Sequence, residues 1–532
     1  MATHISTKKP SASTPKMLKS TKTNATKSGL PLPLALLIAL LAGLGFSLAL
    51  APHYLYPLAI ISPMVLYALL VGEENSRRAF WLGEFYGFGT WLVGAFWLYT
   101  SIHQYGGIAD WLAMAMIVAM AIVMGLFHAV MSWLFVRYMG RQPLAFAGLW
   151  VVQEWCKTWL LTGFPWLFVG YAFTEVSWLN GLAPIAGVFG LSFLAVLFGA
   201  ATIELFRQRG GYMAIAATLT ALTAIISWQA IDWTKKTGDN LSVSLVQGNI
   251  PQDLKWLTEY RLEGLNIYTQ LSESELGRDL LIWPEAAITF FQDDAELFLN
   301  GFSDTAKQAG TTWITGIPYR DGTSGKMYNG VMSFDDETGI YRKQNLVPFG
   351  EYIPFQGMLN LLPNMLNLPD SFSKGSDNQA ALMVKNQQMG VAICYEVAYP
   401  ATTRNNAKSS DFLLTVSNDA WFGTSAGPMQ HLQMVQMRSL ETGRWFVRAT
   451  NNGVTAIIDH HGKVVSSVPQ FERTVLRGEV ESRTGNTPYM ILGSLPILIL
   501  SILLIGLSLL VKLRGTYQST YEKYYTARGV SD

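Results

Sequence analysis

The chain has 532 residues, of which 50% are hydrophobic and only 14% are charged, and its formal net charge is +1. A chain of this length is expected to fold as more than one unit, and so apolar a composition is typical of a membrane protein. The small net charge, without a basic patch carrying interleaved aromatic residues, excludes nucleic acid as an expected partner. The only two cysteines, Cys156 and Cys394, lie in very different contexts, so no disulfide framework is expected.

Residues 1–29 contain six lysines and no acidic residue, which predicts a disordered basic tail. Long apolar runs follow, and each can cross a bilayer core, which takes roughly 20 helical residues. These runs lie at 31–50, 54–72, 80–101, 110–136, 143–161, 182–205, 211–231 and 490–511. We therefore predict a transmembrane domain at 30–234 with seven helices, and an eighth transmembrane helix at 486–513.

The short loops between the runs predict an orientation. Arginines fall in alternate loops, at positions 77, 78, 137, 141, 207 and 209. Lys and Arg are also present in the two terminal segments, 1–29 and 514–532, taken together. Because positively charged loops face the cytoplasm, we expect both termini in the cytoplasm and the long segment at 235–485 on the outer side of the membrane.

The outer segment, 235–485, has the composition of a water-soluble domain. Short apolar runs typical of buried strands begin at positions 242, 280, 312, 330, 389, 412, 444 and 453. Helical stretches are predicted near 257–276, 293–309 and 429–443. Apolar runs that alternate with helices indicate a layered α/β domain, and about 250 residues is enough for one such domain with a full core.

Three stretches of this domain place an ionisable side chain just after a strand-like run: Glu285 in "LLIWPEAA", Lys343 in "YRKQNLVPFGEYIP" and Cys394 in "MGVAICYE". Residues at strand ends project into the crevices where α/β folds hold ligands. A carboxylate can take the thiol proton, the thiolate can attack, and an ammonium can stabilise the resulting oxyanion. Each residue alone has an ordinary interpretation, as a helix cap, an exposed charge or a core thiol. Their order and contexts together favour a site with a cysteine nucleophile.

The motifs "LIWPEAA", "YRKQNLVPFGEYIP" and "GVAICYE", in this order, resemble the Glu-Lys-Cys signature of the nitrilase, or carbon-nitrogen hydrolase, superfamily. The stretches "VQGNIPQDLKW", "LVPFGEYIPF" and "SNDAWFGTSAGPMQHLQMVQMRSLETGR", in a domain held between membrane spans, are similar to its membrane branch, the apolipoprotein N-acyltransferases. This resemblance covers the chain from about residue 30. It implies an αββα sandwich for the outer domain, joined to an eight-helix transmembrane domain in a bacterial inner membrane, with the catalytic domain in the periplasm.

The resemblance also implies a reaction. An acyl chain of a phospholipid, usually phosphatidylethanolamine, passes to cysteine as a thioester and then to the α-amino group of the diacylglyceryl-cysteine that begins a lipoprotein. Carried over by motif, Glu285 is the general base, Lys343 the oxyanion stabiliser and Cys394 the nucleophile. The residues expected to support them or to bind substrate are Glu351, Tyr395, Glu396 and Trp256. We expect a monomer that uses no cofactor and no metal ion.

The segment at 355–372 follows the lysine motif and is rich in Leu and Met, but also in Pro and Asn. A thioester intermediate must be kept from water, and its lipid substrates come from the bilayer. We predict that this segment is a mobile apolar lid that admits acyl chains. The alternative is a loop that packs on the core of the domain.

Three other functions compete with this interpretation. A membrane-anchored amidase would use Glu285, Lys343 and Cys394 but release the acyl group to water. A papain-like thiol hydrolase would use His431 as the base for Cys394. A transporter is disfavoured, because the apolar runs show neither an evident repeat nor a convincing set of interior charges.

Ionisable residues within apolar runs are candidates for function. We interpret those of this chain as structural: Glu84, His128, Glu154, Lys157 and Glu204. Glu154 and Lys157, three positions apart, are expected to pair on one helix face. The stretch "IDHHGKV" at 458–464 predicts a turn between strands and no metal site, because no Cys or carboxylate of suitable spacing accompanies the histidines.

Overall fold

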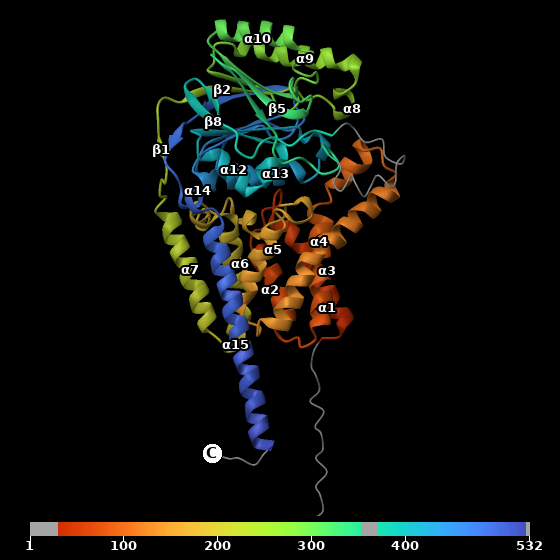
Figure 1. Ribbon diagram of the computed structural model, residues 1–532, viewed down its shortest axis with the longest axis vertical. Helices are drawn as coiled ribbons and strands as arrows, with labels where there is room; N and C mark the ends of the chain where they lie inside the picture. The colour runs from red at the N-terminus through yellow and green to blue at the C-terminus, as the bar shows by residue number, and fades with distance from the viewer. Residues whose placement is uncertain (1–29, 353–370, 528–532) are drawn as a thin grey trace, which may run out of the picture.

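The computed structural model describes residues 30–352 and 371–527, with the side chains described up to residue 518 (Figure 1). The predicted tail at 1–29 and all but the last two residues of the predicted lid at 355–372 lie outside the described residues. A bundle of helices forms one end of the molecule and a domain of two sheets forms the other, as Figure 1 shows.

Helices occupy each of the eight apolar runs. They are α1 (Leu32–Phe46), α2 (Leu58–Val71), α3 (Ser76–Gly94), α4 (Asp110–Tyr138), α5 (Pro143–Cys156), α6 (Ala183–Phe206), α7 (Gly211–Trp228) and α15 (Leu495–Ala527). Among the described residues, the segments long and apolar enough to cross a membrane number five: Leu32–Ala49, Asp110–Tyr138, Asn180–Phe206, Gly211–Trp228 and Leu495–Gln518. α2 and α5 have only 14 residues each. Several apolar membrane helices are therefore present, and the count of eight spans stays a prediction.

Two buried ionisable groups of this bundle, Glu154 and Lys157, have contacts that show how they are held. Oε1 of Glu154 accepts hydrogen bonds from the indole of Trp150 at 3.1 Å and from the backbone N–H of Val169 at 2.9 Å. Within the described chain no ion pair joins Glu154 to Lys157, whose ammonium instead lies 5.6 Å from the ring centre of Trp91. The expected pairing on one helix face is thus replaced by a contact within α5 and by contacts with other segments.

Two six-stranded sheets form the outer domain. The first has the order β13-β2-β3-β4-β5-β6 and consists of β2 (Leu241–Gln247), β3 (Leu280–Ile282), β4 (Thr312–Arg320), β5 (Met327–Phe334), β6 (Thr338–Arg342) and β13 (Thr474–Val480). The second has the order β12-β11-β10-β9-β8-β7 and consists of β7 (Leu382–Val384), β8 (Gln387–Ile393), β9 (Phe412–Ser417), β10 (Phe446–Thr450), β11 (Ala456–Ile458) and β12 (Val464–Ser467). A short ribbon of β1 (Lys235–Lys236) and β14 (Arg483–Thr484) connects the domain to the bundle.

Helices cover the outer face of each sheet, which confirms the predicted αββα layering. α9 (Thr258–Ser272) and α10 (Glu296–Gln308) cover the first sheet, and α12 (Pro400–Ala407) and α13 (Gly427–Thr442) cover the second (Figure 1). Aliphatic side chains that are buried between the sheets form the core of the sandwich, among them Leu245, Ile282, Val391, Leu414 and Val447. Burying a side chain of this size contributes about 1.5–3 kcal/mol.

α13 lies between the second sheet and the helical bundle, and all of its residues except the partly buried Met429 are buried. Polar contacts tie it to the bundle. Gln430 accepts a hydrogen bond from the indole of Trp166 at 2.7 Å, and Glu441 accepts one from the backbone N–H of Val188 at 2.8 Å. The sandwich is therefore packed directly against the apolar helices. Residues at the end of the sandwich that faces the bundle lie next to these helices.

Candidate active site

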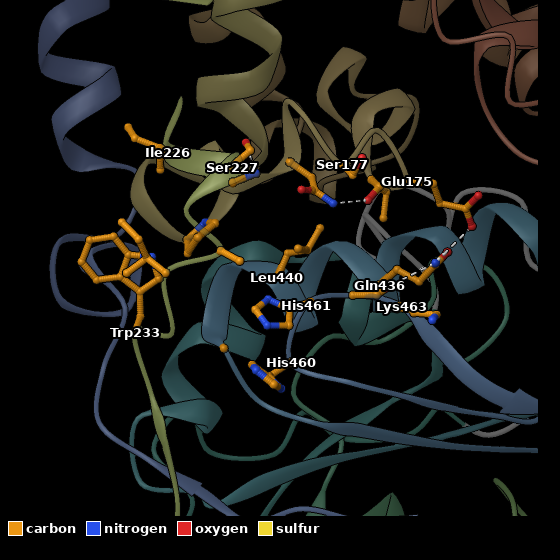
Figure 2. A pocket seen from close by; sticks show the side chains of 18 of the residues that line it. Glu175, Ser177, Ile226, Ser227, Trp233, Gln436, Leu440, His460, His461 and Lys463 are labelled. Atoms are coloured by element: carbon orange, nitrogen blue, oxygen red, sulfur yellow. Dashed lines mark hydrogen bonds between the residues drawn. The ribbon is translucent and has the colours of Figure 1, made fainter. Parts of the chain in front are cut away.

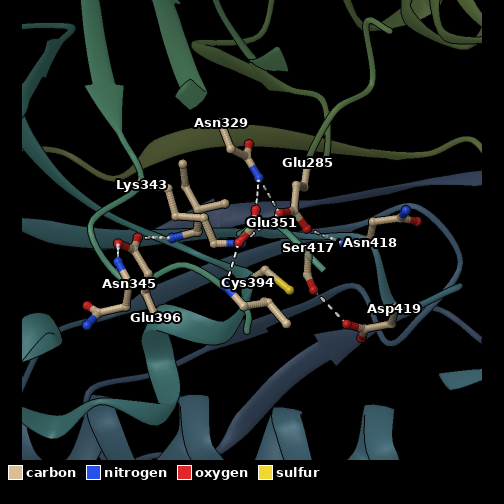
Figure 3. Close-up of polar contacts among 12 residues, drawn as sticks. Glu285, Asn329, Lys343, Asn345, Glu351, Cys394, Glu396, Ser417, Asn418 and Asp419 are labelled. Atoms are coloured by element: carbon tan, nitrogen blue, oxygen red, sulfur yellow. Dashed lines mark hydrogen bonds and ion pairs between the residues drawn. The ribbon is translucent and has the colours of Figure 1, made fainter. Parts of the chain in front are cut away.

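Glu285, Lys343 and Cys394 lie together at one end of the sandwich, as Figure 3 shows. Glu285 follows β3 of the first sheet after two residues, Lys343 follows β6 directly, and Cys394 follows β8 of the second sheet directly. β3 is parallel to its neighbours β2 and β4, and β8 is parallel to β9. β6 is antiparallel to β5, which is antiparallel to β4, so β6 runs in the same direction as β3 and β4. Strands that run in the same direction end at the same edge of a sheet, and the three side chains meet in one crevice between the two sheets.

A buried ion pair forms the centre of the site. The ammonium of Lys343 donates to Oε1 of Glu285 at 3.2 Å and to Oε1 of Glu351 at 2.9 Å. The amide of Asn329 donates to the same two oxygens, at 2.8 Å each. The second oxygen of Glu285 accepts the backbone N–H of Asn418 at 2.9 Å. Because both carboxylates are held by several donors, the ammonium of Lys343 has a fixed position.

The charges of this pair reinforce each other. Burial alone raises the pKa of Glu285, but the ammonium of Lys343 and the hydrogen bond from Asn329 outweigh it and hold that pKa below its ordinary value. Burial likewise lowers the pKa of Lys343, but Glu285 and Glu351 outweigh it and hold that pKa well above its ordinary value. At neutral pH the carboxylate is therefore ready to accept a proton and the lysine is a cation.

The thiol of Cys394 lies beside Glu285 and Lys343 and next to Ser417, as Figure 3 shows. Burial raises the pKa of the thiol, the negative charge of Glu285 adds to this effect, and the ammonium of Lys343 opposes it. The resting site thus holds a neutral thiol next to an ionised carboxylate. In this arrangement the thiol must give up its proton at the moment of attack, and Glu285 is the adjacent acceptor.

The backbone at Cys394 is strained. Its φ is +50°, in the left-handed region that costs a residue with a side chain of the order of 1–3 kcal/mol. It lies at the turn between β8 and a short helix, Cys394–Ala398. Sharp strand-to-helix turns of this kind expose a nucleophile at the tip of a sheet.

Two buried side chains hold this turn. Glu396 accepts the backbone N–H of Ile393 at 2.6 Å and that of Asn345, in the segment after Lys343, at 3.1 Å. His431, from α13, contacts the carbonyl oxygen of Cys394 through Nε2 at 2.9 Å. The first contact joins the cysteine turn to the lysine loop, and the second fixes the strained peptide from the side of the helical bundle.

His431 is in the wrong place to be the base of a papain-like enzyme. Its Nε2 contacts the backbone carbonyl of Cys394, and its Nδ1 lies 3.2 Å from Oδ1 of Asp419. Asp419 is in turn paired with Arg448 through its other oxygen at 2.5 Å. Both nitrogens of the ring are therefore engaged in positioning contacts, which disfavours the papain-like alternative.

The remaining predicted residues lie around this centre in different ways. Glu351 contacts Lys343 directly, and Glu396 holds the backbone next to Cys394 and Lys343, as described above. The hydroxyl of Tyr395 donates to the carbonyl of Gly163 at 3.2 Å, in the loop between α5 and α6, so Tyr395 joins the nucleophile turn to the helical bundle. The side chain of Trp256 is 41% exposed, and among the described residues no polar contact links it to the centre.

Three residues of the site were absent from the sequence-based prediction: Asn329, Asn418 and Lys255. The ammonium of Lys255 is buried and donates to the backbone carbonyl of Glu285 at 3.1 Å. Burial lowers the pKa of Lys255 to about 8, against the opposing charge of Glu285. Asn418 follows β9 directly, so the strand-end rule that identified Cys394 also applies to it.

Comparison with known proteins agrees with this geometry. A family model described as the apolipoprotein N-acyltransferase N-terminal domain matches residues 42–201, and one described as carbon-nitrogen hydrolase matches residues 242–489. The apolipoprotein N-acyltransferase of Pseudomonas putida is 42% identical over 489 residues, which cover 89% of this chain and 96% of that protein. The corresponding protein of Vibrio parahaemolyticus is 37% identical over 478 residues, covering 87% of this chain and 94% of its own. The chain belongs to the apolipoprotein N-acyltransferase family, and its outer domain is of the carbon-nitrogen hydrolase type.

Proposed function

We propose that this protein transfers an acyl chain from a membrane phospholipid to the α-amino group of the S-diacylglyceryl-cysteine at the start of a lipoprotein, through a thioester on Cys394. The observation that carries the proposal is the Glu285–Lys343 ion pair beside the strained Cys394, at the end of a sandwich that packs on apolar helices. Membership of the apolipoprotein N-acyltransferase family supports acylation of lipoproteins as the reaction.

In the first half-reaction Cys394 attacks the ester carbonyl of the phospholipid. Glu285 takes the thiol proton as the C–S bond forms, and Lys343 stabilises the oxyanion of the tetrahedral intermediate. The C–O bond to the glycerol then breaks, and the proton held by Glu285 passes to the departing alkoxide. The products are an acyl-enzyme thioester and a lysophospholipid.

In the second half-reaction the free α-amine of the lipoprotein attacks the thioester. Glu285 takes a proton from the amine while Lys343 again stabilises the oxyanion. The C–S bond breaks, an amide is formed, and the proton returns to the thiolate of Cys394. The same three residues thus serve both halves of a ping-pong cycle, and Glu285 ends each half-reaction as the carboxylate.

Three supporting residues keep this centre in place. Glu351 orders the ammonium of Lys343, with which it makes a 2.9 Å contact. Glu396 holds the nucleophile turn, and Tyr395 ties that turn to the helical bundle near Gly163. Trp256, which follows the buried Lys255 and is partly exposed, contributes a surface for the substrate.

The arginine pattern supports the proposed membrane placement, and the packing of the sandwich on the bundle is consistent with it. Eight spans in the bacterial inner membrane, with both termini in the cytoplasm, put the domain at 235–485 in the periplasm, where lipoproteins are matured. The N-terminal seven spans occupy 30–234, the eighth occupies 486–513, and cytoplasmic segments lie at 1–29 and 514–532. The enzyme acts as a monomer, and phosphatidylethanolamine is the acyl donor.

An amidase that releases the acyl group to water would use the same three residues, so a product assay must separate the two. The protein in vesicles of phosphatidylethanolamine carrying a labelled sn-1 chain is incubated with a diacylglyceryl-cysteine peptide. We expect labelled N-acyl peptide with wild type and none with Cys394→Ala. Release of labelled fatty acid in place of the N-acyl peptide would identify an amidase.

A further inference from the structure

A second cluster of ionisable side chains lies outside the candidate active site. Asp232 belongs to the segment between α7 and β1, and His460 and His461 belong to the turn between β11 and β12. One ligand atom from each residue lies within 4.8 Å of the others. The sequence predicts no metal site here, because no Cys or carboxylate of suitable spacing accompanies the histidines, but the fold brings a carboxylate to them from 228 positions away.

The turn at Asp459–Lys463 is built to hold both imidazoles on one side. The carboxylate of Asp459 accepts the backbone N–H groups of His461 and Lys463, each at 2.9 Å. Gly462 closes the turn with a φ of +75°. Side chains of consecutive residues in a strand point to opposite faces, but here the ring centres of His460 and His461 are only 4.0 Å apart.

We propose that Asp232, His460 and His461 bind a divalent transition-metal ion, with zinc as the best match. Oδ1 of Asp232 lies 2.9 Å from Nε2 of His460 and 3.3 Å from Nε2 of His461. A tetrahedral zinc ion with bonds of about 2.0–2.1 Å holds its ligand atoms about 3.3 Å apart, which is close to both distances from Asp232, and the whole set lies within 4.8 Å. Two imidazoles and one carboxylate are a ligand set that zinc accepts, with the fourth position open.

The surroundings leave this ligand set free to bind a cation. Arg483 is the nearest positive charge, 3.6 Å from Oδ1 of Asp232, but it has partners of its own: it pairs with Glu481 and donates to the backbone carbonyl of Thr234 at 2.6 Å. Nδ1 of His460 is buried without a hydrogen-bond partner among the described residues.

Both histidines line a cavity of about 570 Å³ between the sandwich and the helical bundle, and Figure 2 shows them next to each other on its wall. The opposite side of this cavity includes Ser177, and Ser227 near the end of α7 also lines it. The two histidines therefore border a space that water can fill. Because Asp232 follows α7 and the histidines belong to the sandwich, the ion would join the last helix before the outer domain to that domain.

Zinc binding to the full-length protein tests this directly. The detergent-solubilised protein, purified through a tag that contains no histidine and treated with EDTA, is titrated with zinc chloride in a calorimeter. We expect one zinc ion per chain. Even residues that only support metal ligands change affinity by about 10–100-fold, so His460→Ala and His461→Ala should each weaken binding by more than about 100-fold. His53→Ala removes an exposed histidine elsewhere and should leave binding unchanged.

A second measurement guards against variants that fail to fold. Cobalt bound to the wild type should give the visible absorption of a four-coordinate ion, and this spectrum should be lost in Asp232→Asn, which keeps the size of the side chain. The variants should still form the thioester on Cys394, because none of these residues touches the active site. Stoichiometric binding that survives both histidine substitutions, or a wild type that binds no zinc, would overturn the proposal.

Discussion

Replacing Glu285 with glutamine keeps the shape of the side chain and removes its ability to take a proton. In the structure Oε1 accepts from Lys343 and Asn329, and Oε2 accepts from the backbone of Asn418. An amide has only one oxygen, so its NH₂ group must face one of these donors, and the loss of that hydrogen bond costs about 1–3 kcal/mol of stability. The variant should therefore fold but be measurably less stable.

The effect on catalysis should be much larger. A positioned general base contributes typically 10²–10⁴-fold, so the rate of thioester formation in Glu285→Gln should fall by about that factor, which corresponds to about 3–5 kcal/mol in the barrier. The thiol itself should become more acidic, because the negative charge that raises the pKa of Cys394 is gone. The variant should thus react faster with iodoacetamide at neutral pH while it acylates more slowly from lipid.

Rapid-quench mass spectrometry of the intact protein, mixed with phospholipid vesicles, measures the acylation rate. Glu275→Gln is the matched control, because Glu275 is also a fully buried carboxylate of the outer domain, paired with Arg477 and remote from Cys394 in the fold. We expect the control to acylate at nearly the wild-type rate. If Glu285→Gln acylates within about threefold of wild type, Glu285 is not the base and the mechanism given above is wrong.

Three further outcomes are expected from the same assay. Lys343→Met should slow thioester formation by about 10²–10³-fold, the usual effect of removing an oxyanion donor, and acylation within fivefold of wild type would exclude that role. His431→Asn should slow thioester formation by a smaller factor, because only a contact to the carbonyl of Cys394 is lost, at a cost of about 1–3 kcal/mol. If His431→Asn formed no thioester while Glu285→Gln acylated normally, a papain-like site would be favoured. The acylation rate should stay level as the pH falls from neutral to about 5 and drop only below the ordinary carboxyl pKa of about 4.3, because the pKa of Glu285 is depressed. Because the pKa of Glu285 is lower in the folded protein than in the unfolded chain, its charge stabilises the fold above the ordinary carboxyl pKa. This stabilisation is lost as the pH falls through the pKa of Glu285 in the folded protein. Measuring the free energy of unfolding over the same pH range therefore tests the direction of the shift.

The strands that the sequence predicts are those that are buried on both faces. β8 and β9 read as continuous apolar runs because one face of each packs in the sandwich core and the other packs under helices. β12 and β13 lie at the edges of the two sheets, with alternating or mixed exposure, and they carry no comparable apolar run. α12 was missed because its sequence, "PATTRNNA", is polar although several of its residues are buried.

The three central residues of the site could be predicted because each follows a strand directly or nearly so. Their partners depend on which strands become neighbours, which is a long-range property of the fold. Lys255 reaches Glu285 only because the segment after β2 folds over the end of β3, and the pairing of Asp232 with two histidines requires the packing of the bundle on the sandwich. Neither contact has a signal in local composition.

The thioester on Cys394 is the feature on which the whole account depends. The most direct test is to incubate the purified protein with phosphatidylethanolamine, measure the intact mass, and map any adduct by peptide digestion. We predict a mass increase of one acyl chain that maps to Cys394, is absent in Cys394→Ala, and disappears when a diacylglyceryl-cysteine peptide is added, with formation of the N-acyl peptide. An N-acyl peptide produced at the wild-type rate by Cys394→Ala, or an acyl adduct on another residue, would contradict the account.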